Sequence, residues 1–159
     1  MALAGSMDLF TMTIPNRISI VLVAGFVVVA PFVGMSIEEF AMHVAAGSAV
    51  LALCFLMFAR GWIGGGDAKV FAAASLWMGF DYLGVFTAYA AMGGGILTFV
   101  LLFFRLLPLP AFMAREAWLA RLHHRQTGVP YGIAIAASAL FVYPMTPYMQ
   151  AAIEAAAIG

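Results

Sequence analysis

Five long apolar segments constrain the fold of this chain more than any other feature of its sequence. Hydrophobic residues make up 65% of the 159 positions and charged residues only 9%, whereas about a quarter of the residues in a soluble domain are charged. A helix needs about 20 mainly apolar residues to cross a bilayer. The apolar segments are residues 18–34, 40–59, 70–80, 82–104 and 129–143, and the third is long enough to cross only when it is counted from Gly64, as residues 64–80. The sequence therefore predicts an all-α, polytopic transmembrane bundle of about five spans, in a single domain covering residues 1–159.

The N-terminal segment is too short to form a further span of ordinary length. Seven residues precede Asp8, which corresponds to about 10 Å of helix at 1.5 Å per residue. Residues 1–7 also lack the basic region and the apolar core of a cleavable secretory signal. We therefore expect a truncated N-terminal helix ahead of the five spans.

The basic residues predict how the spans are oriented. If the five segments alternate across the membrane, all seven Lys and Arg residues lie on one side. These residues are Arg17, Arg60, Lys69, Arg105, Arg115, Arg121 and Arg125. Lys and Arg collect on the cytoplasmic side of membrane proteins, so we expect a multi-pass protein with Asp8 and Asp67 at the cytoplasmic face. The net charge of zero gives no indication of a nucleic-acid partner.

Asp67 lies between two apolar segments and directly follows three glycines, Gly64, Gly65 and Gly66. A carboxylate at a membrane boundary is costly, which makes Asp67 a candidate functional residue. The glycines would let another chain approach the acid closely, and in that case Gly66→Val, and to a lesser degree Gly64→Val, would impair function. The alternative is a polar turn in which Asp67 and Lys69 face water.

Asp8 and Asp67 together would supply the groups needed for acid and base hydrolysis of a peptide bond. When two carboxyl groups lie close together, repulsion and partial burial raise the pKa of one of them, so that the pair shares a proton. The ionised member can then take a proton from water while the protonated member donates to the scissile carbonyl.

Other candidate sites are weaker. His123 and His124 are adjacent, so they point in different directions on a helix, and the sequence contains no HExxH motif. The single cysteine, Cys54, lies in an apolar segment and is interpreted as a packed thiol. His43 is interpreted as a satisfied interface or packing residue. We therefore expect no metal site and no cofactor.

Two further stretches bear on packing. The polar connection after Arg105 predicts a short helix over residues 111–124, with Trp118 on its apolar side, that lies in the membrane interface. The alternative is a solvated loop. Three consecutive glycines, at positions 93–95, lie within an apolar segment and predict close contact between helices.

Three motifs, taken together, resemble those of a known family. The motifs are residues 8–17 (DLFTMTIPNR), residues 64–69 (GGGDAK) and residues 129–134 (VPYGIA). In order and spacing they resemble the type IV prepilin peptidases, in the short form found with tight-adherence (Flp) pilus systems. The resemblance extends from Asp8 to about Tyr148. The first segment departs from the family because it is more apolar than the usual basic one.

The resemblance implies a bacterial intramembrane aspartyl endopeptidase of the GxGD class, with Asp8 and Asp67 as its catalytic pair. Such enzymes remove the basic leader of a prepilin at the cytoplasmic face of the inner membrane, just before the apolar helix. The expected partners are a prepilin, the lipid bilayer and the pilus assembly machinery. Asn16, Lys69 and Tyr131 lie in the matching motifs and are candidates for accessory roles. With one cysteine, the chain resembles the form without a paired-cysteine insert.

Two other functions are compatible with an intramembrane carboxylate. A small transporter or proton-conducting protein would use Asp67 as its titrating site, although such sites more often lie near the bilayer midplane. A structural subunit of a pilus assembly machine would need neither acid. The predicted position of both acids near one face favours the peptidase.

Overall fold

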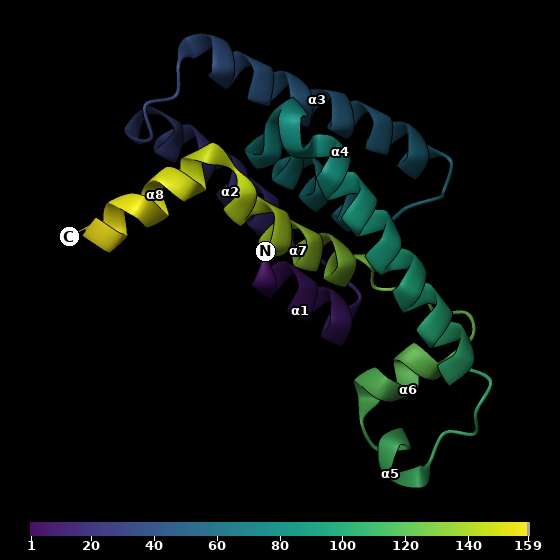
Figure 1. The fold of residues 1–159 in the computed structure, drawn as a ribbon. Coiled ribbons are helices and arrows are strands. Elements are labelled where there is room, and N and C mark those ends of the chain that lie inside the picture. Colours follow the sequence, from purple (N-terminus) through teal and green to yellow (C-terminus); the bar gives the residue numbers. More distant parts are fainter. Residues whose placement is uncertain (159) are drawn as a thin grey trace.

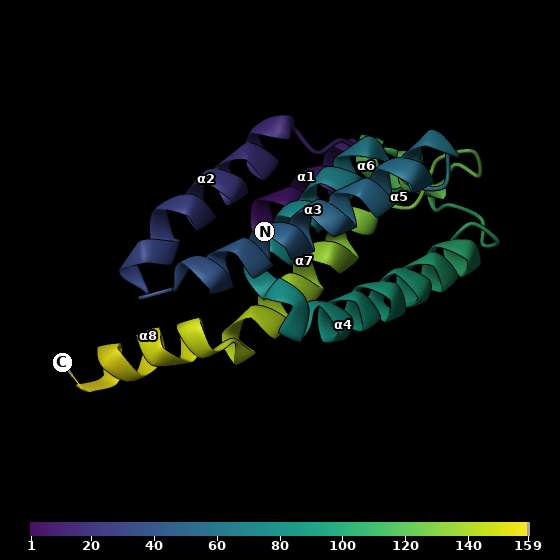
Figure 2. The same cartoon turned by 90° about the horizontal axis from the view of Figure 1, so that it is seen from above.

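The computed structural model describes residues 1–158, and every regular element in that range is helical. The elements are α1 (Ala2–Thr11), α2 (Asn16–Phe32), α3 (Ile37–Ala59), α4 (Gly65–Phe104), α5 (Ala111–Ala114), α6 (Ala117–His123), α7 (Tyr131–Val142), the 3₁₀ turn η1 (Tyr143–Met145) and α8 (Pro147–Ile158). Helices α3 and α7 pack against α4, and α1 packs against α7 (Figures 1 and 2). The predicted all-α class is confirmed.

Helix α4 is folded back on itself at Gly79. This is the one residue of α4 with non-helical backbone angles (φ 62°, ψ −177°), and its positive φ is readily adopted only by glycine. The rings of Phe71 and Phe86 stack with their centroids 4.9 Å apart, whereas 15 residues of straight helix would separate them by about 22 Å. Residues 65–78 and 80–104 therefore form two arms that lie side by side, matching the two predicted segments 64–80 and 82–104.

The number of spans is not confirmed. By length and apolarity, α3 and α4 could each cross a membrane. A third candidate span is formed by α7 and η1 together with α8, if these two helical segments are counted as one span despite the bend of 62° between them. Helix α2 has only 17 residues. Two or three candidate spans among the described residues support a membrane protein. They do not establish the predicted total of about five.

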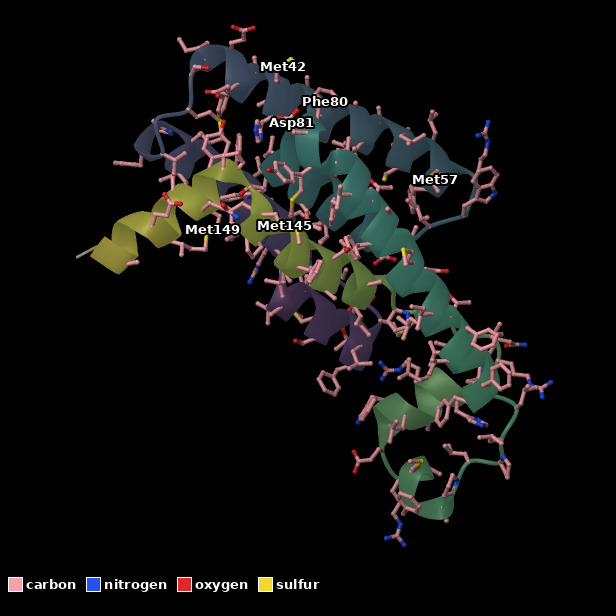
Figure 3. All side chains as sticks on the ribbon, in the orientation of Figure 1. Met42, Met57, Phe80, Asp81, Met145 and Met149 are labelled. Atoms are coloured by element: carbon pink, nitrogen blue, oxygen red, sulfur yellow. The ribbon has the colours of Figure 1, made fainter. Side chains whose placement is uncertain are left out.

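His43 packs over the reversal of α4. Its Nδ1 lies 2.8 Å from the carbonyl oxygen of Leu76, and its ring stacks on Phe26 at 5.5 Å. A Cβ on Gly79 would lie 2.8 Å from the same imidazole, so glycine is required there for space as well as for φ. The packing role predicted for His43 is confirmed. Figure 3 shows Phe80 and Asp81 beside Met42, at the end of α3 away from Met57.

A capping box determines where α3 begins. The Ser36 hydroxyl accepts from the backbone N–H of Glu39, and the Glu39 carboxylate accepts from the backbone N–H of Ser36. This reciprocal pair satisfies two donors that the first turn would otherwise leave free. The helix therefore starts at Ile37, three residues before the predicted apolar segment, and carries Glu38 and Glu39 in its first turn.

The connection after α4 contains two short helices, so the prediction of one helix over residues 111–124 is wrong. Glu116 adopts extended backbone angles (φ −86°, ψ 110°) and separates α5 from α6. The Trp118 ring packs edge-on against Phe10 at 5.4 Å, and Arg121 Nη1 donates to the Phe10 carbonyl at 2.8 Å. The apolar side of α6 thus contacts the end of α1.

Arg105 fastens this connection to the end of α4. Its Nε donates to the Leu122 carbonyl, and its Nη2 donates to the carbonyls of Thr127 and Gly128. These bonds satisfy carbonyls that have no helical partner, and they fix the chain just before α7 begins. The start of α7 is therefore held in place from two sides, by α1 and by the end of α4.

Two glycines of the second arm of α4, Gly93 and Gly94, contact α7, in line with the close helix contact that the run at 93–95 predicted. A Cβ on Gly94 would lie 2.6 Å from Cε1 of Tyr131, whose hydroxyl lies 3.0 Å from Thr98 Oγ1. We expect Gly94→Ala to displace this ring and to destabilise the fold by about 1–3 kcal/mol, the usual cost of overpacking. The thermal midpoint of the detergent-purified protein measures this change.

Gly95→Ala is the matched control, because no atom lies within 4 Å of a Cβ built there. Equal midpoints for the two variants would contradict the contact between Gly94 and Tyr131 as a source of stability.

Candidate active site

Asp8 lies near the end of α1 and faces the start of α7. The backbone N–H of Gly132 donates to Asp8 Oδ2 at 2.7 Å, and Asp8 is only 5% exposed. Gly132 is the second residue of α7, after its N-cap Pro130. The first N–H groups of a helix have no intrahelical partner and attract anions. The N-terminus of α7 therefore holds the Asp8 carboxylate.

Close packing of α1 on α7 makes this contact possible. A Cβ on Gly5 would lie 3.0 Å from the Ala136 Cβ, and a Cβ on Gly132 would lie 2.8 Å from Asp8 Oδ2. Any side chain at position 132 would therefore occupy the place of the carboxylate. Helix α1 has ten residues and lies outside the candidate spans. Burial raises the pKa of Asp8, and the Gly132 N–H opposes that rise by stabilising the charged form.

Asp67 lies in the first turn of α4, where a negative charge is favoured by the helix dipole. A Cβ on Gly64, the N-cap, would lie 3.1 Å from Asp67 Oδ2, so the carboxylate folds back over the start of its own helix. Among the described residues, no donor reaches Asp67 Oδ1, although this atom is buried. A buried acceptor without a donor costs about 1–3 kcal/mol, which suits a protonated oxygen or one that meets water or substrate.

The structure brings Asp8 and Asp67 together around Gly132. The Gly132 N–H binds Asp8, and the two acids are close enough to interact electrostatically. Ile14 fills the space between the starts of α4 and α7, since a Cβ on Gly66 would lie 3.2 Å from Ile14 Cβ and one on Gly132 would lie 2.7 Å from Ile14 Cδ1. The site is therefore a two-carboxylate arrangement built by α1, α4 and α7.

The three glycines before Asp67 have different neighbours. A Cβ on Gly65 would lie 3.3 Å from the ring of Phe58, and one on Gly66 would meet Ile14, whereas one on Gly64 would meet the Asp67 carboxylate. Protein side chains therefore occupy the space beside Gly65 and Gly66. A substrate-approach role stays a prediction, with Gly64 as the glycine that faces the acid.

The predicted accessory residues lie in two places. Lys69 Nζ donates to Asn16 Oδ1 at 2.9 Å, which joins the beginning of α4 to the start of α2. Tyr131 instead directs its hydroxyl to Thr98, away from the acids. The predicted site included Tyr131 but not Gly132 or Ile14, the two residues that the structure places next to the acids. A glycine at the second position of a helix that begins after Pro130 was the available indication.

Other titratable residues make different contacts. His123 Nε2 lies 2.8 Å from the Leu107 carbonyl. Cys54 is buried beside Val50, Ala68 and Ala72, which confirms it as a packed thiol. Within residues 1–158, no three His, Cys, Asp or Glu side chains gather in a way that could hold a metal ion.

Residues 1–119 match the sequence profile of the type IV leader peptidase family. The match covers about three quarters of the chain and includes both Asp8 and Asp67. It ends before α7, the helix that supplies Gly132. Comparison with curated proteins and with solved structures found no match. Together with the apolar helices, the family match shows that this chain is a membrane protein belonging to the type IV leader peptidase family.

Proposed function

We propose that this chain is an aspartic endopeptidase that uses Asp8 and Asp67 to remove the basic leader of Flp-type prepilins. The family supplies the peptidase activity. The observation that carries the proposal is the Asp8 carboxylate, which the Gly132 N–H holds close enough to Asp67 for the two acids to interact. This arrangement holds two carboxyl groups, from segments far apart in the sequence, at one end of the helical bundle.

The hydrogen bonds suggest a role for each acid. Asp8 accepts an N–H, which favours its ionised form, so it serves as the base. Asp67 has a buried oxygen without a donor, which suits the member that holds the proton. Asp8 takes a proton from water as the water oxygen bonds to the scissile carbonyl carbon, and Asp67 donates its proton to the carbonyl oxygen.

The tetrahedral intermediate then collapses. The carbonyl forms again as its C–N bond breaks, and the leaving nitrogen takes the proton that Asp8 received from water. The hydroxyl proton of the intermediate returns to Asp67. Both acids thereby recover their starting states, and neither forms a covalent bond to the substrate.

The charges favour the cytoplasmic face of the bacterial inner membrane. Lys69 follows Asp67 by two residues, and Arg121 donates to Phe10, which follows Asp8 by two residues, so both basic residues lie at the end of the bundle with the acids. The opposite end carries Glu38, Glu39 and Asp81 around one pocket. Because basic residues collect at the cytoplasmic side, this distribution supports a cytoplasmic position for the acids, where they would meet a basic leader. Pilus assembly components are partners in the same proposal.

Co-expression with candidate prepilins tests the proposed function directly. Removal of the leader shortens the substrate, which a gel and N-terminal sequencing of the product detect. Cleavage directly before the apolar segment is the expected result. If an abundant, membrane-inserted wild-type protein left every Flp-type prepilin uncut, the substrate assignment would be wrong.

Chelation provides a further prediction. The histidines and the single cysteine offer no closed set of ligands, and the two carboxyl groups can move the required protons by themselves. We therefore expect the cleavage rate in isolated membranes to be unchanged by EDTA. Loss of cleavage with EDTA, followed by its recovery with added zinc, would contradict this mechanism.

A further inference from the structure

An apolar pocket of about 180 Å³ lies among α1, α2, α4 and α7. Its walls include Met1, Leu22, Ala74, Ala139 and Leu140. Trp77 also lines it, but its indole Nε1 donates to the Leu22 carbonyl at 2.9 Å, so that polar atom is already bonded. Tyr143 lines the pocket as well, but no polar atom contributes to the surface of the pocket, which is therefore suited to a hydrocarbon group.

The pocket is aligned with the two acids along three helices. Met1 lies seven residues from Asp8, Ala74 lies seven residues from Asp67, and Ala139 lies seven residues from Gly132. Residues seven apart occupy nearly the same face of a helix, because 3.6 residues make one turn, and they are separated by about 10 Å. In each helix the step leads from the acids toward the interior of the bundle. The pocket thus lies about 10 Å beyond the acids, on the same side of each helix.

The volume of the pocket matches a single large side chain. An engineered protein cavity of about 150 Å³ accepts benzene, so about 180 Å³ accommodates one phenyl ring or one branched aliphatic group. The pocket is also accessible from outside the bundle, because Leu140 on its wall is 54% exposed. A helix lying against α7 could insert a side chain without crossing the core.

We propose that this pocket is a specificity subsite that receives one large apolar side chain of the substrate, from the segment following the cleaved bond. The inference rests on the proposed function. A substrate cleaved at the acids, whose apolar segment continues into the membrane, must pass the level of the pocket. About 10 Å corresponds to about three residues of extended chain or about seven of helix. The side chain therefore comes from the third to the seventh position after the cleaved bond.

Leu140→Trp tests the subsite by filling it. Phe141→Trp is the matched control, because Phe141 is the next residue, is equally exposed at 54%, and packs on Tyr89 outside the pocket. The substrates are one cleavable prepilin carrying Ala, Leu or Trp at each position from three to seven. We expect one of these substrate positions to respond. For prepilins with Leu or Trp at that position, Leu140→Trp should raise KM at least tenfold while kcat is retained. Ala at that position should restore the KM, and Phe141→Trp should leave the preference unchanged.

Leu140→Ala provides the opposite change and keeps the test independent of how well the tryptophan variant folds. Enlarging the pocket should shift the preference toward Trp at the same substrate position. If the wild type cleaves the prepilin but no position in this window responds to Leu140, the subsite is wrong and the proposed function stands. A response at Phe141 equal to that at Leu140 would also overturn the subsite. A wild type that cleaves no prepilin would overturn the proposed function, and the subsite with it.

Discussion

Asp8→Asn and Asp67→Asn are each expected to reduce leader cleavage by at least about a hundredfold, since positioned acid and base groups contribute about 10²–10⁴ to a rate. An asparagine at position 8 can still accept the Gly132 N–H, so the fold and membrane abundance should be preserved. What the amide loses is the ability to exchange a proton. Cleavage of a co-expressed prepilin and immunoblotting of the membrane fraction measure the two quantities separately.

Asp81→Asn is the control for this prediction, because Asp81 lies by the reversal of α4, beside the pocket at the other end of the bundle. We expect it to cleave at the wild-type rate. If the two acids act as one unit, the double variant should be no slower than either single variant. Near wild-type cleavage by Asp8→Asn or Asp67→Asn would remove that residue from the mechanism.

Gly132→Ala should reduce the rate of leader cleavage by at least about tenfold, although the change adds only one methyl group. The new Cβ would lie 2.8 Å from Asp8 Oδ2 and 2.9 Å from Asp8 Cβ. Ile14 Cδ1 is the tip of a flexible side chain and can move, but the carboxylate cannot move without leaving the N–H that binds it. Misplacing a catalytic group by about 1 Å can cost a hundredfold in rate. We expect kcat to fall, with a smaller effect on KM.

Gly128→Ala is the matched control for this substitution. It lies just before α7, and its added Cβ would meet only Met12 Cε, at an ordinary 3.8 Å. Cleavage should stay near the wild-type rate. An unaltered rate for well-folded Gly132→Ala would show that the position of the Asp8 carboxylate does not limit the reaction.

Local patterns were sufficient to predict most of the helices. Apolar runs predicted α2, α3, α7 and both arms of α4. In lipid every backbone N–H and C=O group must be hydrogen-bonded within the protein, and a single apolar segment achieves this only as a helix. The helix over residues 111–124 was predicted less well. Its break at Glu116 occurs where α6 turns to contact Phe10, a contact between distant segments that no local pattern contains.

The sequence by itself was sufficient to single out Asp8 and Asp67 as candidate catalytic residues, because a carboxylate at the end of an apolar segment is costly wherever the segment packs and both acids lie in recognisable motifs. It also placed Asp8 and Asp67 at the same predicted face. Only the tertiary structure decided how they meet. Gly132 reaches Asp8 across 124 positions of sequence through a backbone N–H, and every residue except proline carries such a group. The identity of the donor therefore depended on how α1 packs on α7, a contact between distant segments that no local sequence pattern reveals.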